Sequence, residues 1–390
     1  MSKSIKRKFF RSVALFLVFV LLVSLAYGFY LYKYDREKFN KLYSYITGDK
    51  SSVITVNGEL SIHFMMLGNE YSGDCTYIKA GDVDILVDAG SRAGSVATIK
   101  EYLDEFVSDG ILEYVIVTHA DRDHIAGFSA SNSLFDEYTC ETIIDFPLTN
   151  KESTTSSGNA SEYGKYVINR DEEIVNGAKH YTALECYNNV GEAKRTYSLT
   201  DEISLTFLYQ KFYEQSSNDE NNYSVCFMLT HGDRNFLFTG DLEKEGEQSL
   251  IQENSLPEVE LFKAGHHGSP TSSNDLLLTV IKPKIVCMCC CAGSVEFTTN
   301  LANTFPSQAF IDRVSKYTDK VYVPIYIDVV YNSEKGKYEN AEQYNELNGN
   351  ISVVSSSDGV IVKGSNNDTK LKDTDWFKNN RTMPTAWKTA

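Results

Sequence analysis

Basic residues are scarce in this sequence relative to acidic ones. The 390 residues include 37 Lys and Arg against 53 Asp and Glu, which gives a formal net charge of −16 at pH 7. Proteins that hold nucleic acid by loose electrostatic attraction carry clustered Lys and Arg. The composition therefore argues against that mode of binding. A polyanionic substrate could still reach a metal site, because bound cations reverse the local field.

The sequence also lacks paired Cys-x-x-Cys motifs at the spacing of zinc fingers. Four of its eight cysteines lie in the segment 287–291. Neighbouring residues of a strand point to opposite faces, so this segment cannot present a single tetrahedral thiolate site. We expect these cysteines to be buried free thiols that act as small apolar residues. The sequence does not indicate whether the others form pairs, and these are Cys75, Cys140, Cys186 and Cys226.

The sequence contains a single long apolar run. Residues 12–31 are free of charge and rich in Leu, Val and Phe, and about 20 such residues suffice to cross a bilayer as a helix. Residues 1–11 are basic, which places them in the cytoplasm and the rest of the chain outside. A cleaved signal peptide with its cleavage site at residues 24–26 is the alternative. Because the run continues beyond Ala26, we prefer an uncleaved, single-pass membrane anchor.

The rest of the chain is predicted to comprise a connector, a domain and a tail. Residues 32–56 form a polar connector, residues 57–364 a globular domain, and residues 365–390 a polar tail. Within the domain, β-branched strand patterns alternate with helical patterns, which is typical of an α/β protein. A stretch rich in Ser, Thr, Gly and Asn at 149–160 predicts a loop. No internal repeat is visible.

Three predicted strands each end in side chains that can bind metals. The first cluster, residues 118–124 (Thr-His-Ala-Asp-Arg-Asp-His), follows the apolar run 114–117. The second is Thr-Gly-Asp at 239–241, and the third is Gly-His-His-Gly-Ser at 265–269. A solvated polar turn is the alternative for any one cluster. Three clusters that converge on one sheet edge favour a dinuclear metal site instead.

These motifs resemble those of the metallo-β-lactamase superfamily. His119–His124 is similar to the His-x-His-x-Asp-His signature, 239–241 to the strand end with the bridging aspartate, and 265–269 to the last histidine motif. The resemblance is strongest to the extracellular hydrolase domain of the competence DNA-uptake channel (ComEC type), and it covers residues 57–364. Further segments similar to that branch are 64–74, 221–225 and 263–269.

The resemblance implies a fold and a set of site residues. The fold would be α/β (α+β), an αββα sandwich behind a single N-terminal transmembrane helix, with one or two divalent ions (Zn or Mn) at one edge. The implied metal ligands are His119, Asp121, Asp123, His124, Asp241 and one of His266 or His267, with His266 taken as the ligand. Asp123 and His267 are assigned to catalysis, His267 by binding the substrate or protonating its leaving group. Asp88 would orient a ligand through a hydrogen bond, and Ser224 would lie beside the ligands.

The chain departs from most of the superfamily at the first metal position. Asp121 stands where a second histidine is usual, and no clear third-motif histidine is present, since His180 and His231 are expected to be structural. A position rich in carboxylate favours a harder ion such as Mn²⁺, or weak occupancy, beside a zinc-type second position. A single metal remains the alternative. Phe305-Pro306 also lies where the competence branch often shows His-Pro.

The sequence thus predicts a membrane-anchored, outward-facing, metal-dependent hydrolase. The most specific expectation is a phosphodiesterase that uses a metal-bound hydroxide on DNA or on a cell-envelope phosphodiester. With one apolar span, the chain is not expected to form a translocation pore itself. β-Lactam hydrolysis is disfavoured, because it usually accompanies an intact histidine triad. The alternative is a non-catalytic surface binding module or receptor that retains the fold. The sequence identifies no protein partner.

Overall fold

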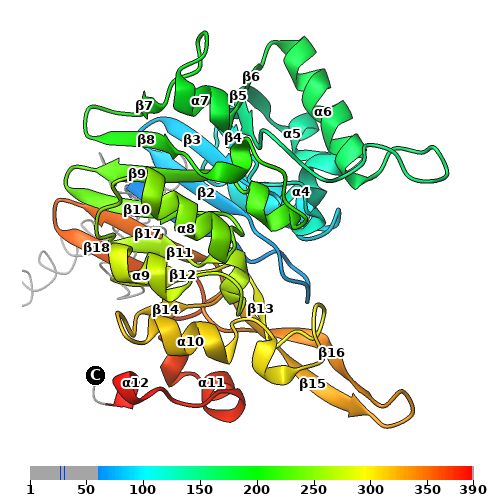
Figure 1. Cartoon of the computed structure of the whole chain (residues 1–390), viewed down its shortest axis with the longest axis vertical. Coiled ribbons are helices and arrows are strands. Elements are labelled where there is room, and N and C mark those ends of the chain that lie inside the picture. Colours follow the sequence, from blue (N-terminus) through cyan, green and yellow to red (C-terminus); the bar gives the residue numbers. More distant parts are fainter. Residues whose placement is uncertain (1–26, 28–29, 31–59, 389–390) are drawn as a thin grey trace, which may run out of the picture. The chain divides into compact units, whose positions relative to one another are not determined.

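The structure is a computed structural model that describes Tyr27, Tyr30 and residues 60–388 (Figure 1). The chain divides into two compact units, Met1–Asn57 and Gly58–Ala390. The predicted anchor and connector lie outside the described residues, apart from the two tyrosines. Among the residues that are described, no helix has the length and apolar character needed to span a bilayer.

The larger sheet combines an antiparallel half with a parallel half. Its eight strands follow the order β18-β17-β1-β2-β3-β4-β5-β6. The pairs from β18 to β3 are antiparallel, and those from β3 to β6 are parallel. The C-terminal hairpin therefore pairs with the first strand of the domain. The bounds are β1 Leu60–Phe64, β2 Thr76–Ala80, β3 Val83–Val87, β4 Ile111–Ile116, β5 Thr139–Asp145, β6 Lys179–Thr182, β17 Ile351–Ser356 and β18 Gly359–Gly364.

A second sheet of seven strands has the order β14-β12-β11-β10-β9-β8-β7. Its pairs from β7 to β10 are antiparallel, and those from β10 to β14 are parallel. The bounds are β7 Thr196–Ser198, β8 Ile203–Leu208, β9 Cys226–His231, β10 Arg234–Phe238, β11 Leu261–Lys263, β12 Ile285–Cys287 and β14 Val321–Tyr322. A small third sheet contains β13 Cys291–Ala292, β15 Ile325–Asn332 and β16 Lys337–Glu346.

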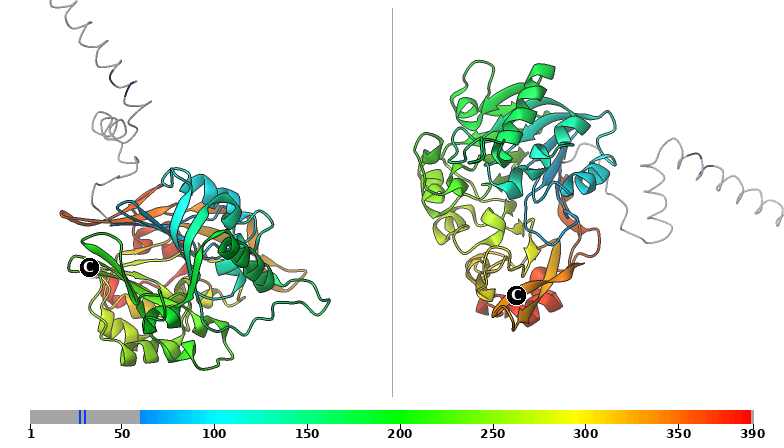
Figure 2. Two further views of the ribbon diagram at one scale, coloured as in Figure 1. Left: turned by 90° about the horizontal axis from the view of Figure 1, so that it is seen from above. Right: turned by 90° about the vertical axis from the view of Figure 1, so that its right-hand side faces the viewer.

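The main core lies between the two large sheets. Alternate residues of β10 show this, because Phe236 and Phe238 join the apolar cluster shared with the first sheet. Leu237 points the other way, as the two-residue period of a strand requires. It joins a cluster with side chains of the helices α8 (Lys244–Glu253), α9 (Asp275–Ile281) and α10 (Gln308–Val314). Those helices lie across from the blue and cyan strands of the first sheet (Figure 2). The architecture is therefore a mixed α/β sandwich, consistent with the metallo-β-lactamase fold.

The helices connect the strands in chain order. Those that follow strands of the first sheet are α3 Ser95–Leu103, α4 Arg122–Ser129, α5 Leu134–Glu137, α6 Glu162–Asn176 and α7 Ala183–Asn188. Those that come later are α8 Lys244–Glu253, α9 Asp275–Ile281, α10 Gln308–Val314, α11 Asp375–Asn380 and α12 Thr385–Lys388. All eight cysteines are buried and free, which confirms the interpretation of the cysteine-rich segment as apolar core.

The C-terminal segment packs against the domain. Residues 365–390 were expected to form a polar tail, yet Trp376, Phe377 and Trp387 are buried in the cluster beneath α10. Burial of such aromatic side chains stabilises by about 1.5–3 kcal/mol each. Before this segment, β17 and β18 form a hairpin, because the turn at 357–358 reverses the chain.

Candidate metal centre

The loop between β4 and α4 carries the first predicted cluster. β4 ends at Ile116 in the parallel half of its sheet, so the following residues emerge at the carboxyl edge. α4 begins at Arg122 with Asp121 at its N-cap, but the Asp121 side chain makes no capping hydrogen bond. His119 and His124 are completely buried. Strand and helix together thus hold the imidazoles inside while Asp121 is free to bond elsewhere.

The second sheet delivers the remaining groups to the same place. Asp241 follows β10, and the two neighbouring histidines follow β11. These strands are parallel neighbours, so both ends lie at one edge. His266 and His267 have φ angles of 47° and 52°, a left-handed conformation that costs about 1–2 kcal/mol for a residue with a side chain. Such backbone strain is concentrated at functional sites.

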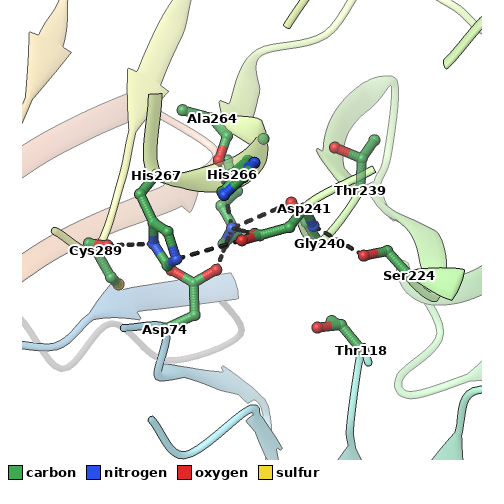
Figure 3. A network of polar contacts seen from close by, with 12 residues as sticks. Asp74, Thr118, Ser224, Thr239, Gly240, Asp241, Ala264, His266, His267 and Cys289 are labelled. Carbon is green, nitrogen blue, oxygen red and sulfur yellow. Dashed lines mark hydrogen bonds and ion pairs between the residues drawn. The ribbon is translucent and has the colours of Figure 1, made fainter. Parts of the chain in front are cut away.

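Four predicted side chains converge into what we term the central cluster: Asp123, His124, Asp241 and His267. His124 Nε2 lies 3.2 Å from Asp241 Oδ2, and His267 Nε2 lies 3.3 Å from the same oxygen. His267 Nε2 is also 3.3 Å from Asp123 Oδ2. Figure 3 shows His267 and Asp241 facing one another. Two imidazole nitrogens therefore lie beside one oxygen of Asp241, and one of them also lies beside Asp123, so that three separate segments of the chain meet here.

His119 and Asp121 lie next to the central cluster. The rings of His119 and His124 are 4.1 Å apart between centroids, and ligand atoms of His119, His124 and Asp241 lie within 4.8 Å of one another. His119 Nε2 is 3.5 Å from Asp121 Oδ2. The structure thus brings together the residues expected on the first metal-binding loop.

The two neighbouring histidines take different positions. His267 is buried in the central cluster, whereas the side chain of His266 is 21% exposed and its Nδ1 lies 3.5 Å from Glu243 Oε1. His266 was taken as the metal ligand and His267 as the catalytic group. The structure places His267, and not His266, beside the other predicted ligands Asp123 and Asp241. Sequence alone could not choose, because the two side chains diverge only through their left-handed backbone angles.

Asp88 holds the imidazole of His124 in one orientation. This is the role that the resemblance implied for Asp88. Its carboxylate accepts hydrogen bonds from Thr118 N and Thr118 Oγ1, each at 2.7 Å, and from His124 Nδ1 at 2.8 Å. The proton is thereby held on Nδ1, and Nε2 is left to face Asp241. Ser224 lies between Asp241 and His119. Its Oγ accepts a hydrogen bond from Asp241 N at 2.9 Å and is 3.4 Å from His119 Nδ1.

Two buried charged residues at this site were not predicted from the sequence. Lys263 forms an ion pair with Asp74, and its Nζ is 3.8 Å from Asp241 Oδ1. Asp74 Oδ1 lies 3.4 Å from His267 Nδ1, beneath that ring in Figure 3. Burial opposes ionisation of Asp74, but Lys263 and His267 lower its pKa to about 2. The sequence did single out the segments 64–74 and 263–269, which contain Asp74 and Lys263, as similar to the competence branch. It assigned no role to either residue.

The donor set fits a divalent cation. His119 Nε2, His267 Nε2 and Asp241 Oδ1 are buried without a hydrogen-bond partner among the described residues, and such groups cost free energy unless a ligand satisfies them. Burial works against a charged His267, yet Asp241 and Asp74 raise its pKa well above the ordinary value. The pocket thus attracts positive charge. Imidazole and carboxylate together suit zinc or manganese.

Part of this chain is similar in sequence to known proteins from several bacteria. Recombination protein 2 of Haemophilus influenzae is 27% identical over 216 residues, which cover 55% of this chain and 22% of that protein. Competence protein ComA of Neisseria gonorrhoeae is 30% identical over 212 residues, or 53% of this chain and 24% of that protein. ComE operon protein 3 of Bacillus subtilis is 27% identical over 179 residues, or 44% and 19%. The homologues of this chain are competence proteins of the ComEC type. The resemblance seen in the sequence is confirmed, although the match covers less than a quarter of each relative.

No protein-family model matches the chain. Among solved structures, the metallo-beta-lactamase fold protein YhfI of Bacillus subtilis matches 68% of this chain and 95% of its own, with a TM-score of 0.40 and 12% identity. A putative metal-dependent hydrolase of Parabacteroides distasonis matches 68% and 92%, with a TM-score of 0.34 and 11% identity.

Proposed function

We propose that this chain is a metal-dependent phosphodiesterase, held at the cell membrane by residues 12–31 with its hydrolase domain outside the cell. The observation that carries the proposal is the central cluster, in which two imidazoles and two carboxylates from three segments of the chain converge. A purely structural polar core would satisfy its buried atoms with hydrogen bonds. Here His267 Nε2 in the central cluster, and His119 Nε2 beside it, are buried without a hydrogen-bond partner among the described residues.

The central cluster would hold the metal, and one divalent ion there would supply an activated water and positive charge for the developing oxyanion. The chain's own contribution is preorganisation. Asp88 keeps the proton of His124 on Nδ1, and the carbonyl of Cys289 accepts from His267 Nδ1 at 2.9 Å, so both Nε2 atoms face inward. His266, beside Glu243 and partly exposed, is placed to hydrogen-bond the substrate or to protonate its leaving group.

DNA is the favoured substrate, and a cell-envelope phosphodiester is the alternative. The relatives named for competence and recombination support DNA. The net charge of −16 limits any extended electrostatic grip on a polyanion. Recognition would therefore be confined to the neighbourhood of the metal, where one phosphodiester at a time is bound.

The test is turnover of bis-p-nitrophenyl phosphate by the purified full-length chain in detergent, with added Mn²⁺ or Zn²⁺. Asp123→Ala should lose metal and activity together, whereas Asp328→Ala, an exposed carboxylate on β15, should behave as the unaltered chain. Metal binding without turnover of any phosphodiester would favour the non-catalytic binding module. Cleavage of choline phosphodiesters without cleavage of single-stranded DNA would decide for the envelope substrate.

A further inference from the structure

A buried carboxylate ties the loop after β5 to the first metal-binding loop. Glu220 is 4% exposed and accepts hydrogen bonds from Ala120 N at 3.1 Å, Thr149 Oγ1 at 2.8 Å and Asn150 N at 2.9 Å. Thr149 Oγ1 in turn accepts from Lys151 N at 3.0 Å. A carboxylate that accepts three such bonds holds both loops in one arrangement. The backbone of Lys151 is therefore fixed beside the candidate metal centre.

The side chain of Lys151 reaches into that centre. Its Nζ lies 2.5 Å from Asp121 Oδ1, and 39% of the side chain is exposed, so it enters from the solvent side. His119 Nε2 is 3.5 Å from the other oxygen of Asp121. Asp121, the carboxylate that replaces the usual second histidine, is thus shared between an imidazole and an ammonium group.

The half of the site around Asp121 has few donors left for a second metal. Ser224 stands in place of a third histidine, and its Oγ already bonds Asp241 N. Asp241 directs Oδ2 to the central cluster, while its Oδ1 lies 3.8 Å from Lys263 Nζ. Catalytic zinc sites usually use about three protein ligands. Apart from His124 and Asp241, which it would have to share with the central cluster, this half offers one imidazole and one carboxylate already paired with Lys151. By contrast, the central cluster offers two imidazoles and two carboxylates.

We propose that the centre binds one divalent ion, in the central cluster, and that the ammonium group of Lys151 supplies the second positive charge and binds a phosphoryl oxygen of the substrate. Lysine is a compact cation that binds phosphate well. The inference rests on the proposed phosphodiesterase function. It assigns a positioning residue from the loop 149–160, outside the three motifs.

The number of bound metals is the first test. Full-length chain is loaded with excess Mn²⁺ and desalted, and manganese per chain is measured by elemental analysis and electron paramagnetic resonance. One ion with an uncoupled six-line signal is expected. Two ions with a spin-coupled signal would overturn this inference and leave the proposed function standing. No bound metal would overturn both.

The second test measures the affinity for inorganic phosphate by calorimetry, with one equivalent of Mn²⁺ present. Lys151→Met keeps the length of the side chain and removes its charge, and we expect affinity to fall about tenfold, the equivalent of one charge-assisted hydrogen bond. Lys151→Arg should retain most of the affinity. The matched control is Lys316→Met, which removes an exposed lysine paired with Asp275 and should change nothing. Equal affinities for Lys151→Met and the unaltered chain would refute the role of Lys151.

Discussion

Replacement of Asp88 by Asn tests whether the orientation of His124 controls metal binding. Asp88 has a φ of 57°, a conformation that Asn tolerates better than most residues, so the backbone should be unaffected. The amide oxygen can still accept from Thr118 N. Its NH₂ group, however, would face the Nδ1–H of His124, where the carboxylate now accepts at 2.8 Å. Relief of this clash moves the proton to Nε2, the atom that must bind metal.

We expect Asp88→Asn to weaken Mn²⁺ affinity by about 10- to 100-fold, the range found for partners of metal-bound histidines. The free energy of unfolding of the metal-free chain should fall by about 1–3 kcal/mol, because a buried hydrogen bond is lost. Calorimetric titration with Mn²⁺ and urea unfolding followed by fluorescence measure the two effects.

Asp145→Asn is the matched control. Asp145 is also buried and accepts from Tyr166 Oη at 2.8 Å, Arg170 Nη1 at 2.9 Å and His180 Nε2 at 2.9 Å. This variant should lose a similar amount of stability and retain its metal affinity. If the Asp88→Asn chain is destabilised but binds Mn²⁺ normally, Asp88 has only a structural role and does not control metal binding through His124.

Three further outcomes are expected. His267→Ala should abolish tight Mn²⁺ binding in calorimetry while His266→Ala retains it and lowers turnover; the opposite pattern would restore the original assignment. Lys263→Met removes the ammonium partner of the buried Asp74 and leaves it only neighbouring imidazoles, so the free energy of unfolding should fall by about 3–5 kcal/mol; a smaller loss, measured by urea unfolding, would show that water reaches the pair. Despite burial, neighbouring carboxylates raise the pKa of His124 and His267 well above 6.5. Protonation therefore stabilises the metal-free fold fully below that pH, and the stabilisation is lost as pH rises through the raised values. Thermal unfolding should show this loss without metal, and bound Mn²⁺ should remove it.

The metal-binding motifs were predictable because each follows a strand with a clear apolar pattern. Parallel neighbours such as β10 and β11 end at one edge, so the meeting of Asp241 with His267 follows from the fold. The assignment between His266 and His267 was not predictable, because it depends on backbone angles that no residue type at those positions dictates.

Contacts between distant segments were also invisible in the sequence. The stretch 149–160 was correctly expected as a loop, but only Glu220 shows that it is fastened beside Ala120. The C-terminal residues looked polar because Trp376, Phe377 and Trp387 are the few large apolar side chains in a hydrophilic stretch. Their burial depends on α10, which is distant in the sequence. The predicted anchor at 12–31 remains a prediction, since the structure does not describe it.

The position of the bound metal can be seen in a crystal of the chain soaked in Mn²⁺, with anomalous diffraction recorded at the manganese edge. We expect one peak within about 2.0–2.3 Å of ligand atoms of Asp123, His124, Asp241 and His267, and none between His119 and Asp121. A map with no peak among those four side chains would show that the central cluster is not a metal site.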